Sequence, residues 1–257
     1  LETVAQRLIR DGFDRTIITP LFENPGVLFT TKGVNILFSH FEFATSYHQF
    51  LETASLDKAV LFASENAPVL ERAEQTYGVD KTVITAILLL ETHLGANPGK
   101  FSTVSMLSTV SSLDDENLRT RIWEAIPQKT KPTNKAFVAN VETSTNEAYN
   151  ELKALLQYTR KEGIAPETIH GSYSGTFGIC QFKPSDALAF ARDGNSDGRI
   201  DLFNIEDAVF SVANYLKQHG WKPGLSRQQQ FDVIYTYNDN NYYVDTVQKV
   251  SDKLKEK

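Results

Sequence analysis

Glu91 is the first residue whose position suggests chemistry. It follows Ile84 by seven positions, with Ile87 and Leu88 at i+3 and i+4, so on a helix its carboxyl group shares a face with three large apolar side chains. Apolar surroundings disfavour the ionised form and raise a carboxyl pKa, and a carboxylic acid that is still protonated near neutral pH can act as a general acid. The spacing alone favours the alternative, a structural glutamate at a helix end that turns outward or pairs with a cation.

Oxygen donors in the last third of the chain follow the spacing of a calcium-binding loop. Asp193, Asn195 and Asp197 occupy loop positions 1, 3 and 5, Gly198 occupies position 6, and the backbone carbonyl of Arg199 falls at position 7. A hard cation such as Ca²⁺ prefers oxygen ligands, and the glycine permits the sharp turn. The pattern therefore predicts a cation site.

The end of this loop departs from the usual pattern. Position 12 is normally a bidentate glutamate, but here it is Asn204. Asp207, at position 15 and just inside the next expected helix, can supply the missing carboxylate if the loop is three residues longer. A turn rich in Asp, Asn and Gly that binds no ion is the alternative.

Two further segments have the composition of a ligand site. Gly171, Gly175 and Gly178 permit close backbone approach and positive φ angles, although their spacing is not that of a dinucleotide-binding loop. Near the C-terminus, aromatic and amide side chains gather at one helix-loop junction, namely Tyr235, Tyr237, Asn238, Asn241, Tyr242 and Tyr243. Aromatic faces beside amide groups suit sugar rings, and packing or capping explains the cluster about as well.

The elements that must position these residues are mostly helices, because apolar residues recur at spacings of three and four and strand alternation is scarce. Asp80 is expected to cap a helix that ends at Gly95. This helix is apolar over most of its circumference, so we expect it to be central and buried. A hairpin is expected over 27–38, around Thr30–Gly33. The other expected helices are 3–10, a run within 41–77, 103–113, 115–125, 134–160, 184–191, 207–219, 226–237 and 242–255. In the 41–77 run, Ser55 is a candidate cap, Pro68 marks a kink or a new first turn, and Gly78 ends the run.

Composition narrows the class of protein. The chain has 257 residues and a formal net charge of -6, the wrong sign for a protein that neutralises nucleic-acid phosphates. Its single cysteine, Cys180, cannot form an internal disulfide, and no Cys/His cluster offers a structural zinc site. The longest apolar run is far shorter than the roughly 18 to 20 residues of a membrane span. Because the chain begins at Leu1, we expect that an N-terminal segment, such as an export signal or a lipid anchor, was removed.

Three blocks of the sequence resemble the membrane-bound lytic murein transglycosylase B family, bacterial enzymes that cleave peptidoglycan glycan strands. The blocks are Glu91-Thr-His-Leu-Gly95, then Gly171 to Phe182 with Pro184-Ser185, then Asp193 through Asp207 into the stretch from Ser211 to Trp221. The resemblance implies a mainly α, lysozyme-like core over 55–257, with an EF-hand-like calcium loop at 193–207. Residues 1–54 match least and are expected to form an N-terminal accessory helical segment.

The resemblance also implies the roles of individual residues. Glu91 is implied to be the single catalytic acid and base. The glycan cleft is implied to be lined by Ser172, Gln181, Tyr215, Tyr237, Asn238 and Tyr243. The family's loop is the 15-position type, so the implied ligands of a structural Ca²⁺ are Asp193, Asn195, Asp197, the Arg199 carbonyl and Asp207. No organic cofactor is implied.

The implied reaction cleaves the β-1,4 bond between N-acetylmuramic acid and N-acetylglucosamine. Glu91 protonates the glycosidic oxygen and then, ionised, accepts the proton of the muramyl 6-hydroxyl, which closes a 1,6-anhydro ring. Ordinary glycosidases need two carboxylates. Here the intramolecular nucleophile and the substrate's own N-acetyl group are thought to replace the second.

Two departures from the family bear on this reading. Leu94 replaces a usual aromatic residue, and Cys180 replaces a smaller one. The departures favour one alternative function, a catalytically silent peptidoglycan-binding or scaffold protein. A muramidase that uses water is a separate alternative. The expected partner is the peptidoglycan glycan strand, bound by a monomer in the periplasm of a Gram-negative bacterium. No nucleic acid and no membrane span are expected; a lost lipid anchor would place the protein at the outer membrane.

Overall fold

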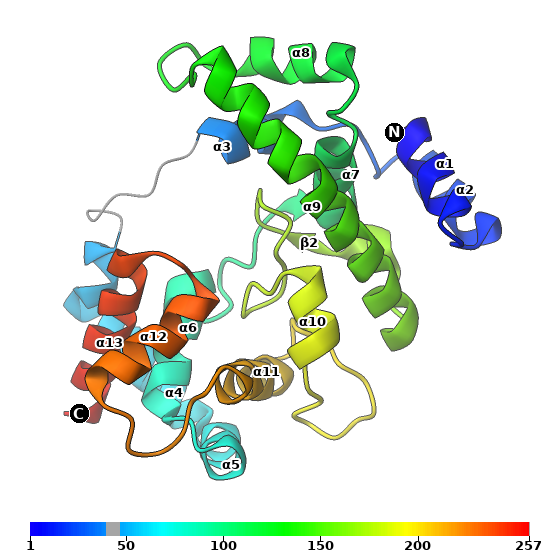
Figure 1. The fold of residues 1–257 in the computed structure, drawn as a ribbon. Helices are drawn as coiled ribbons and strands as arrows, with labels where there is room; N and C mark the ends of the chain where they lie inside the picture. The colour runs from blue at the N-terminus through cyan, green and yellow to red at the C-terminus, as the bar shows by residue number, and fades with distance from the viewer. Residues whose placement is uncertain (40–46, 257) are drawn as a thin grey trace. The chain divides into compact units, whose positions relative to one another are not determined.

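The computed structural model describes residues 1–39 and 47–256, which fall into two units (Figure 1). The first comprises Leu1–Phe41, Gly99–Phe177 and Phe182–Leu188, and the second Glu42–Pro98, Gly178–Gln181 and Ala189–Lys257. Each unit is therefore assembled from segments that are distant in the sequence. This division groups the chain differently from the boundary expected near residue 54, and an accessory role for residues 1–54 stays a prediction.

The first unit is mainly helical and carries one short strand pair. Its elements are α1 (Glu2–Arg10), α2 (Arg15–Glu23), α3 (Thr31–Ser39), β1 (Phe101–Ser102), α7 (Thr103–Ser111), α8 (Glu116–Ala125), α9 (Asn134–Glu162), η3 (Pro166–Thr168) and β2 (His170–Gly171). The two strands pair antiparallel, with Phe101 opposite Gly171. The helix α10 (Pro184–Phe190) follows.

The core of the first unit lies between α7 and α9, which pack along each other. Every residue of α7 is buried, and several of its hydroxyl groups are hydrogen-bonded: Ser111 donates to the Leu107 carbonyl oxygen, and Ser105 accepts from the Leu28 amide. Such bonds make burial of a helix rich in Ser and Thr tolerable. The buried hydroxyls of Thr103 and Ser108 have no hydrogen-bond partner among the described residues. On α9, Tyr149 and Leu152 are among the fully buried side chains.

The predicted hairpin over 27–38 is wrong, because residues 31–39 form the helix α3. Val34 and Phe38, four positions apart, are both buried, and the Phe38 ring meets the Phe137 ring edge-on at 5.3 Å. A Cβ at Gly33 would lie 2.3 Å from the Met106 sulfur, so the glycine serves helix packing and not a turn. Tertiary packing thus overrides the weak Thr-Gly turn signal. The sequence also missed α2, which Asp14 caps by accepting from the Thr16 amide.

The second unit is wholly helical within the described residues. Its elements are η2 (His48–Leu51), α4 (Thr53–Glu65), α5 (Ala67–Tyr77), α6 (Lys81–Thr92), α11 (Ile205–Gln218), α12 (Arg227–Tyr237) and α13 (Asn241–Lys255). Nine of the twelve residues of α6 are buried, which confirms the predicted central buried helix. In this unit α13 packs along α6 (Figure 1). The helix α6 is also contacted by α4, α5 and α11.

Several predicted helix ends are confirmed and two are corrected. Gly78 ends α5 in the left-handed region at φ 70°, and Pro68 lies in the first turn of that helix. Ser55 does not cap α4: Glu52 is the N-cap residue, and the Ser55 hydroxyl donates to the Gln49 carbonyl oxygen. The helix α6 ends at Thr92, three residues before Gly95. The first residues of the predicted 41–77 run lie outside the described part of the chain. Among the described helices, none is long and apolar enough to cross a bilayer.

Candidate active site

Glu91 lies in the last turn of α6, where it is half-buried. Its Oε1 accepts a hydrogen bond of 2.7 Å from the Tyr243 hydroxyl on α13. Tyr243 is only 2% exposed, so this donor is held within the packed α6–α13 interface. The structure therefore brings Glu91 and Tyr243 together, two of the residues that the sequence singled out.

The helix α6 ends in an unusual backbone conformation directly after Glu91. His93 and Leu94 are both in the left-handed region, at φ 49° and φ 64°, although neither is glycine. The Leu94 amide donates to the Leu88 carbonyl oxygen and the His93 amide to that of Leu89, which satisfies two carbonyl groups at the helix end. Left-handed backbone at non-glycine residues costs energy and concentrates at functional sites. Leu94, noted from sequence as a departure, thus takes part in this helix end.

Thr92 joins the end of α6 to the segment 178–181. Its hydroxyl donates to the Ile179 carbonyl oxygen at 2.8 Å and accepts from the Gly95 amide at 2.9 Å. The side chain is fully buried. Thr92 was not predicted as a site residue, because a threonine beside a glutamate carries no signal until its partner 87 positions away is known.

The segment 178–181 brings Cys180 and Gln181 to the same unit as Glu91. Cys180 is fully buried. Gln181 is held at φ 50°, and its Nε2 donates to the carbonyl oxygens of Gly178 at 2.7 Å and Pro98 at 3.0 Å. The amide of Gln181 therefore cross-links two stretches of backbone.

Tyr237 ends α12, and its hydroxyl donates a 2.5 Å hydrogen bond to the Cys180 carbonyl oxygen. Burial of the hydroxyl raises the pKa of Tyr237 well above its ordinary value, and electrostatic interaction with Cys180 and Glu91 raises it further. The influence of Glu91 on this pKa places the two side chains in one electrostatic environment.

Tyr215 and Asn238 complete the predicted set in the second unit. The Tyr215 hydroxyl donates to the Thr236 carbonyl oxygen at 2.6 Å, and its ring stacks on His219 at 4.0 Å and meets the Tyr237 ring edge-on at 5.0 Å. Asn238 is the C-cap residue of α12. Both therefore border Tyr237.

Ser172, the remaining predicted glycan-binding residue, belongs to the first unit. Its hydroxyl shares hydrogen bonds with the hydroxyls of Ser174 at 2.7 Å and Thr176 at 2.8 Å. Gly171 beside it is tightly enclosed, because a Cβ there would lie 1.9 Å from the Thr176 carbonyl oxygen. The glycine-rich stretch is thus a compact turn in which glycine is sterically required.

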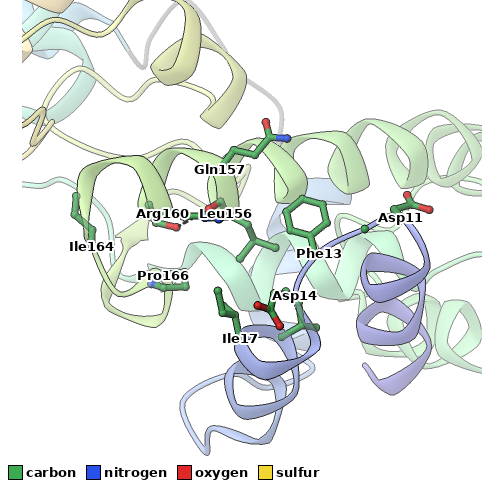
Figure 2. Close-up of a pocket in the computed structure, with 12 residues that line it drawn as sticks. Asp11, Phe13, Asp14, Ile17, Leu156, Gln157, Arg160, Ile164 and Pro166 are labelled. Atoms are coloured by element: carbon green, nitrogen blue, oxygen red, sulfur yellow. Dashed lines mark hydrogen bonds between the residues drawn. The ribbon is translucent and has the colours of Figure 1, made fainter.

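The first unit also contains a cavity of about 330 Å³ that includes none of the predicted site residues. It lies among the α1–α2 connection, α2 and the C-terminal part of α9 (Figure 2). Its lining is mainly apolar and includes Phe13, Ile17, Leu156, Ile164 and Pro166.

The loop 193–207 is held together by its own side chains. The two oxygens of Asp193 accept from the amides of Ser196 and Gly198, Asn195 Oδ1 accepts from the Asp197 amide, and Asp197 Oδ1 accepts from the Arg199 amide. Such side-chain turns make the loop compact.

Asp207 is almost fully buried at 1% exposure and joins the two ends of this loop. It accepts from the amides of Gly194 at 2.8 Å and Asp201 at 2.7 Å. Burial raises the pKa of its carboxyl above the ordinary value, against the opposing effect of these hydrogen bonds. The described residues contain no group of three or more His, Cys, Asp or Glu side chains placed to hold a metal ion. The all-oxygen donors suit Ca²⁺, and several of their side-chain oxygens accept hydrogen bonds from backbone amides of the loop.

A family model described as "Transglycosylase SLT domain" matches residues 1–230. The chain belongs to the transglycosylase SLT domain family. Among relatives of this transglycosylase domain, the membrane-bound lytic murein transglycosylase B of Escherichia coli (strain K12) is 30% identical over 176 residues. The alignment covers 68% of this chain and 41% of that protein, so the matched part spans about two fifths of the relative's length.

Solved structures of lytic transglycosylases share the fold of this transglycosylase domain. The soluble lytic transglycosylase SltB1 from Pseudomonas aeruginosa superposes with a TM-score of 0.80 at 23% identity, over 99% of this chain and 97% of that one. The Escherichia coli lytic transglycosylase Slt35 in complex with calcium gives 0.78 at 21% identity, over 99% and 92%. SltB3 from Pseudomonas aeruginosa in complex with NAG-anhNAM-pentapeptide gives 0.79 at 18%, over 99% and 78%. The expected mainly helical lytic transglycosylase fold is confirmed.

Proposed function

We propose that this transglycosylase domain is a peptidoglycan lytic transglycosylase with Glu91 as its single acid and base. The observation that carries the proposal is the Glu91 carboxyl group, which stands at the end of a buried helix and receives a hydrogen bond from the buried Tyr243 hydroxyl. Peptidoglycan, or murein, as the substrate class is supported by membership of the transglycosylase family and by the name of the relative, a lytic murein transglycosylase.

The proposed reaction balances without water. Because Tyr243 donates to Oε1, the acid proton of neutral Glu91 resides on Oε2. Glu91 gives that proton to the glycosidic oxygen as the bond from C1 of N-acetylmuramic acid breaks. The ionised carboxylate then accepts the proton of the 6-hydroxyl as O6 bonds to C1, which yields a 1,6-anhydro end and restores neutral Glu91. The intramolecular nucleophile supplies a large effective concentration.

The remaining proposed site residues would bind and orient the glycan. The hydroxyls of Tyr215 and Tyr237 donate to backbone carbonyls, so their contribution to sugar binding comes from their rings. Gln181 and Asn238 add amide groups beside those rings. Ser172 is proposed as a further contact of the glycan.

We also propose that the loop 193–207 binds a structural Ca²⁺ through Asp193, Asn195, Asp197, the Arg199 carbonyl and Asp207. The support is the oxygen donor set and the calcium complex of Slt35. A bound ion would supply charge neutralisation for the buried Asp207 and no step of the reaction. Arg72 already braces the loop by donating to the Gly194 carbonyl oxygen at 2.7 Å.

The proposed substrate sets the proposed place of action. Peptidoglycan lies in the periplasm of Gram-negative bacteria, and the relatives compared come from two such organisms. We therefore propose that the chain acts in the periplasm. We also propose that it acts as a monomer.

Digestion of purified peptidoglycan tests the function. We expect products with 1,6-anhydromuramic acid ends by mass spectrometry, and loss of activity in Glu91→Gln by a factor of about 10² to 10⁴. Glu65→Gln, at the exposed end of α4, is the matched control and should keep full activity. Reducing ends would indicate a hydrolase, and binding without cleavage by the unaltered chain would indicate a scaffold. Full activity in Glu91→Gln would refute the assignment.

A further inference from the structure

Two aromatic residues ahead of α4 pack against the groups that hold Glu91. Tyr47 immediately precedes η2 and Phe50 lies within it. Both are buried, at 8% and 5% exposure, and η2 contacts α13 and α4. Both residues fall within the expected accessory segment 1–54, and in the structure they belong to the same unit as Glu91.

Tyr47 contacts the hydrogen-bond donor of Glu91. Its ring meets the Tyr243 ring edge-on, with centroids 6.3 Å apart and an interplanar angle of 84°. This is the T-shaped geometry that aromatic pairs favour. Because the Tyr243 hydroxyl is bonded to Glu91 Oε1, a contact that limits rotation of the Tyr243 ring also limits movement of the carboxyl group.

Phe50 contacts the end of the helix that carries Glu91. Its ring lies 5.2 Å from the imidazole of His93, at an angle of 34°. His93 is the left-handed C-cap residue of α6, two positions after Glu91. The rings of Tyr47 and Phe50 are 6.4 Å apart, so one aromatic group braces both the donor and the strained helix end.

We propose that Tyr47 and Phe50 are positioning residues that fix the orientation of the Glu91 carboxyl group through Tyr243 and His93. This inference rests on the proposed function, since it assigns a role in the reaction of Glu91. Side chains locked by packing hold a reacting group in productive geometry, and misplacement by about 1 Å can cost on the order of 100-fold in rate. Neither Tyr47 nor Phe50 is required to touch the substrate.

The test separates positioning from stability. Tyr47→Leu and Phe50→Leu should each lower kcat by about tenfold while KM changes less than about twofold, because carboxyl orientation and not glycan binding is disturbed. Tyr47→Phe keeps the ring and should restore most of kcat. The control Tyr77→Leu removes a comparable edge-on pair, Tyr77 with Phe210 at 5.8 Å and 86°, away from Glu91, and should leave kcat unchanged.

A double-mutant cycle tests the route through Tyr243. In a Tyr243→Phe background, which lacks the bond to Glu91, Tyr47→Leu should lower kcat by less than about threefold. Kinetics are normalised to folded protein by circular dichroism, and Tyr47→Met replaces Tyr47→Leu if the latter does not fold.

Three outcomes would overturn the inference: Tyr47→Leu with unaltered kcat, Tyr47→Phe as impaired as Tyr47→Leu, or fully additive effects in the cycle. Any of these beside an inactive Glu91→Gln refutes the inference alone. An active Glu91→Gln refutes the proposed function, and the inference with it.

Discussion

The Tyr243 hydroxyl donates a 2.7 Å hydrogen bond to Glu91 Oε1 across 152 positions of sequence. It joins α13 to the end of α6 at the carboxyl group proposed to act as acid and base. Hydrogen bonds to a charged group contribute about 1.5–3 kcal/mol. The bond therefore matters both for holding the carboxyl group and for its proton affinity.

Tyr243→Phe should lower kcat by about 10- to 100-fold, the rate equivalent of that bond. Donation to a carboxylate favours its ionised form, so the variant should hold the acid proton to higher pH. We expect the alkaline limb of the pH profile of kcat to move upward. Tyr242→Phe, an exposed neighbour on the same helix, is the control. An unmoved limb in Tyr243→Phe would show that the bond does not act on Glu91.

Thr92→Val should destabilise the second unit by about 1–3 kcal/mol, because it leaves the Ile179 carbonyl and the Gly95 amide without their partner. Thr92→Ser keeps the hydroxyl and should lose less. Urea unfolding measures both free energies. Equal losses in the two variants would mean that the methyl group, and not the hydroxyl, is what the site needs.

Tyr237 should make stability fall above pH 10. Its native pKa is raised, and an unfolded tyrosine titrates at about 10, so its contribution is complete below that pH and is lost as the pH rises further. The loss in unfolding free energy between pH 8 and 10.5 should be up to about 1 kcal/mol smaller in Tyr237→Phe. Tyr149, whose pKa is also raised, titrates in both proteins and cancels. Identical losses would contradict the prediction.

Calcium should stabilise the chain if the loop 193–207 binds it. Ca²⁺ at 100 times its dissociation constant adds about 2.7 kcal/mol, so chelation should lower the melting temperature and added Ca²⁺ should restore it. Asp193→Ala should abolish the response. Asp201→Asn, an Asp in the loop outside the proposed ligand set, should retain it. No shift in the unaltered chain with either treatment would argue against the site.

Local pattern was sufficient for most of the helices, although it missed α2 and α3, and it marked Glu91 only as a candidate acid. The apolar repeat Ile84, Ile87, Leu88 predicted a buried helix, and α6 is one because period-3.6 spacing forces those side chains onto one stripe. The hairpin failed because the burial of Val34 and Phe38, and the fit of Gly33 against Met106, depend on partners far away in sequence.

The sequence by itself determined the helical class, the candidate acid and the loop's oxygen donors, since these depend on residue type and short spacing. Only the tertiary structure decided that Tyr243 faces Glu91, that Thr92 bonds Ile179, and that Tyr47 and Phe50 brace the helix end. The physical reason is range. Hydrogen bonds and ring contacts act over a few ångströms, and which residues come that close is set by the packing of whole helices.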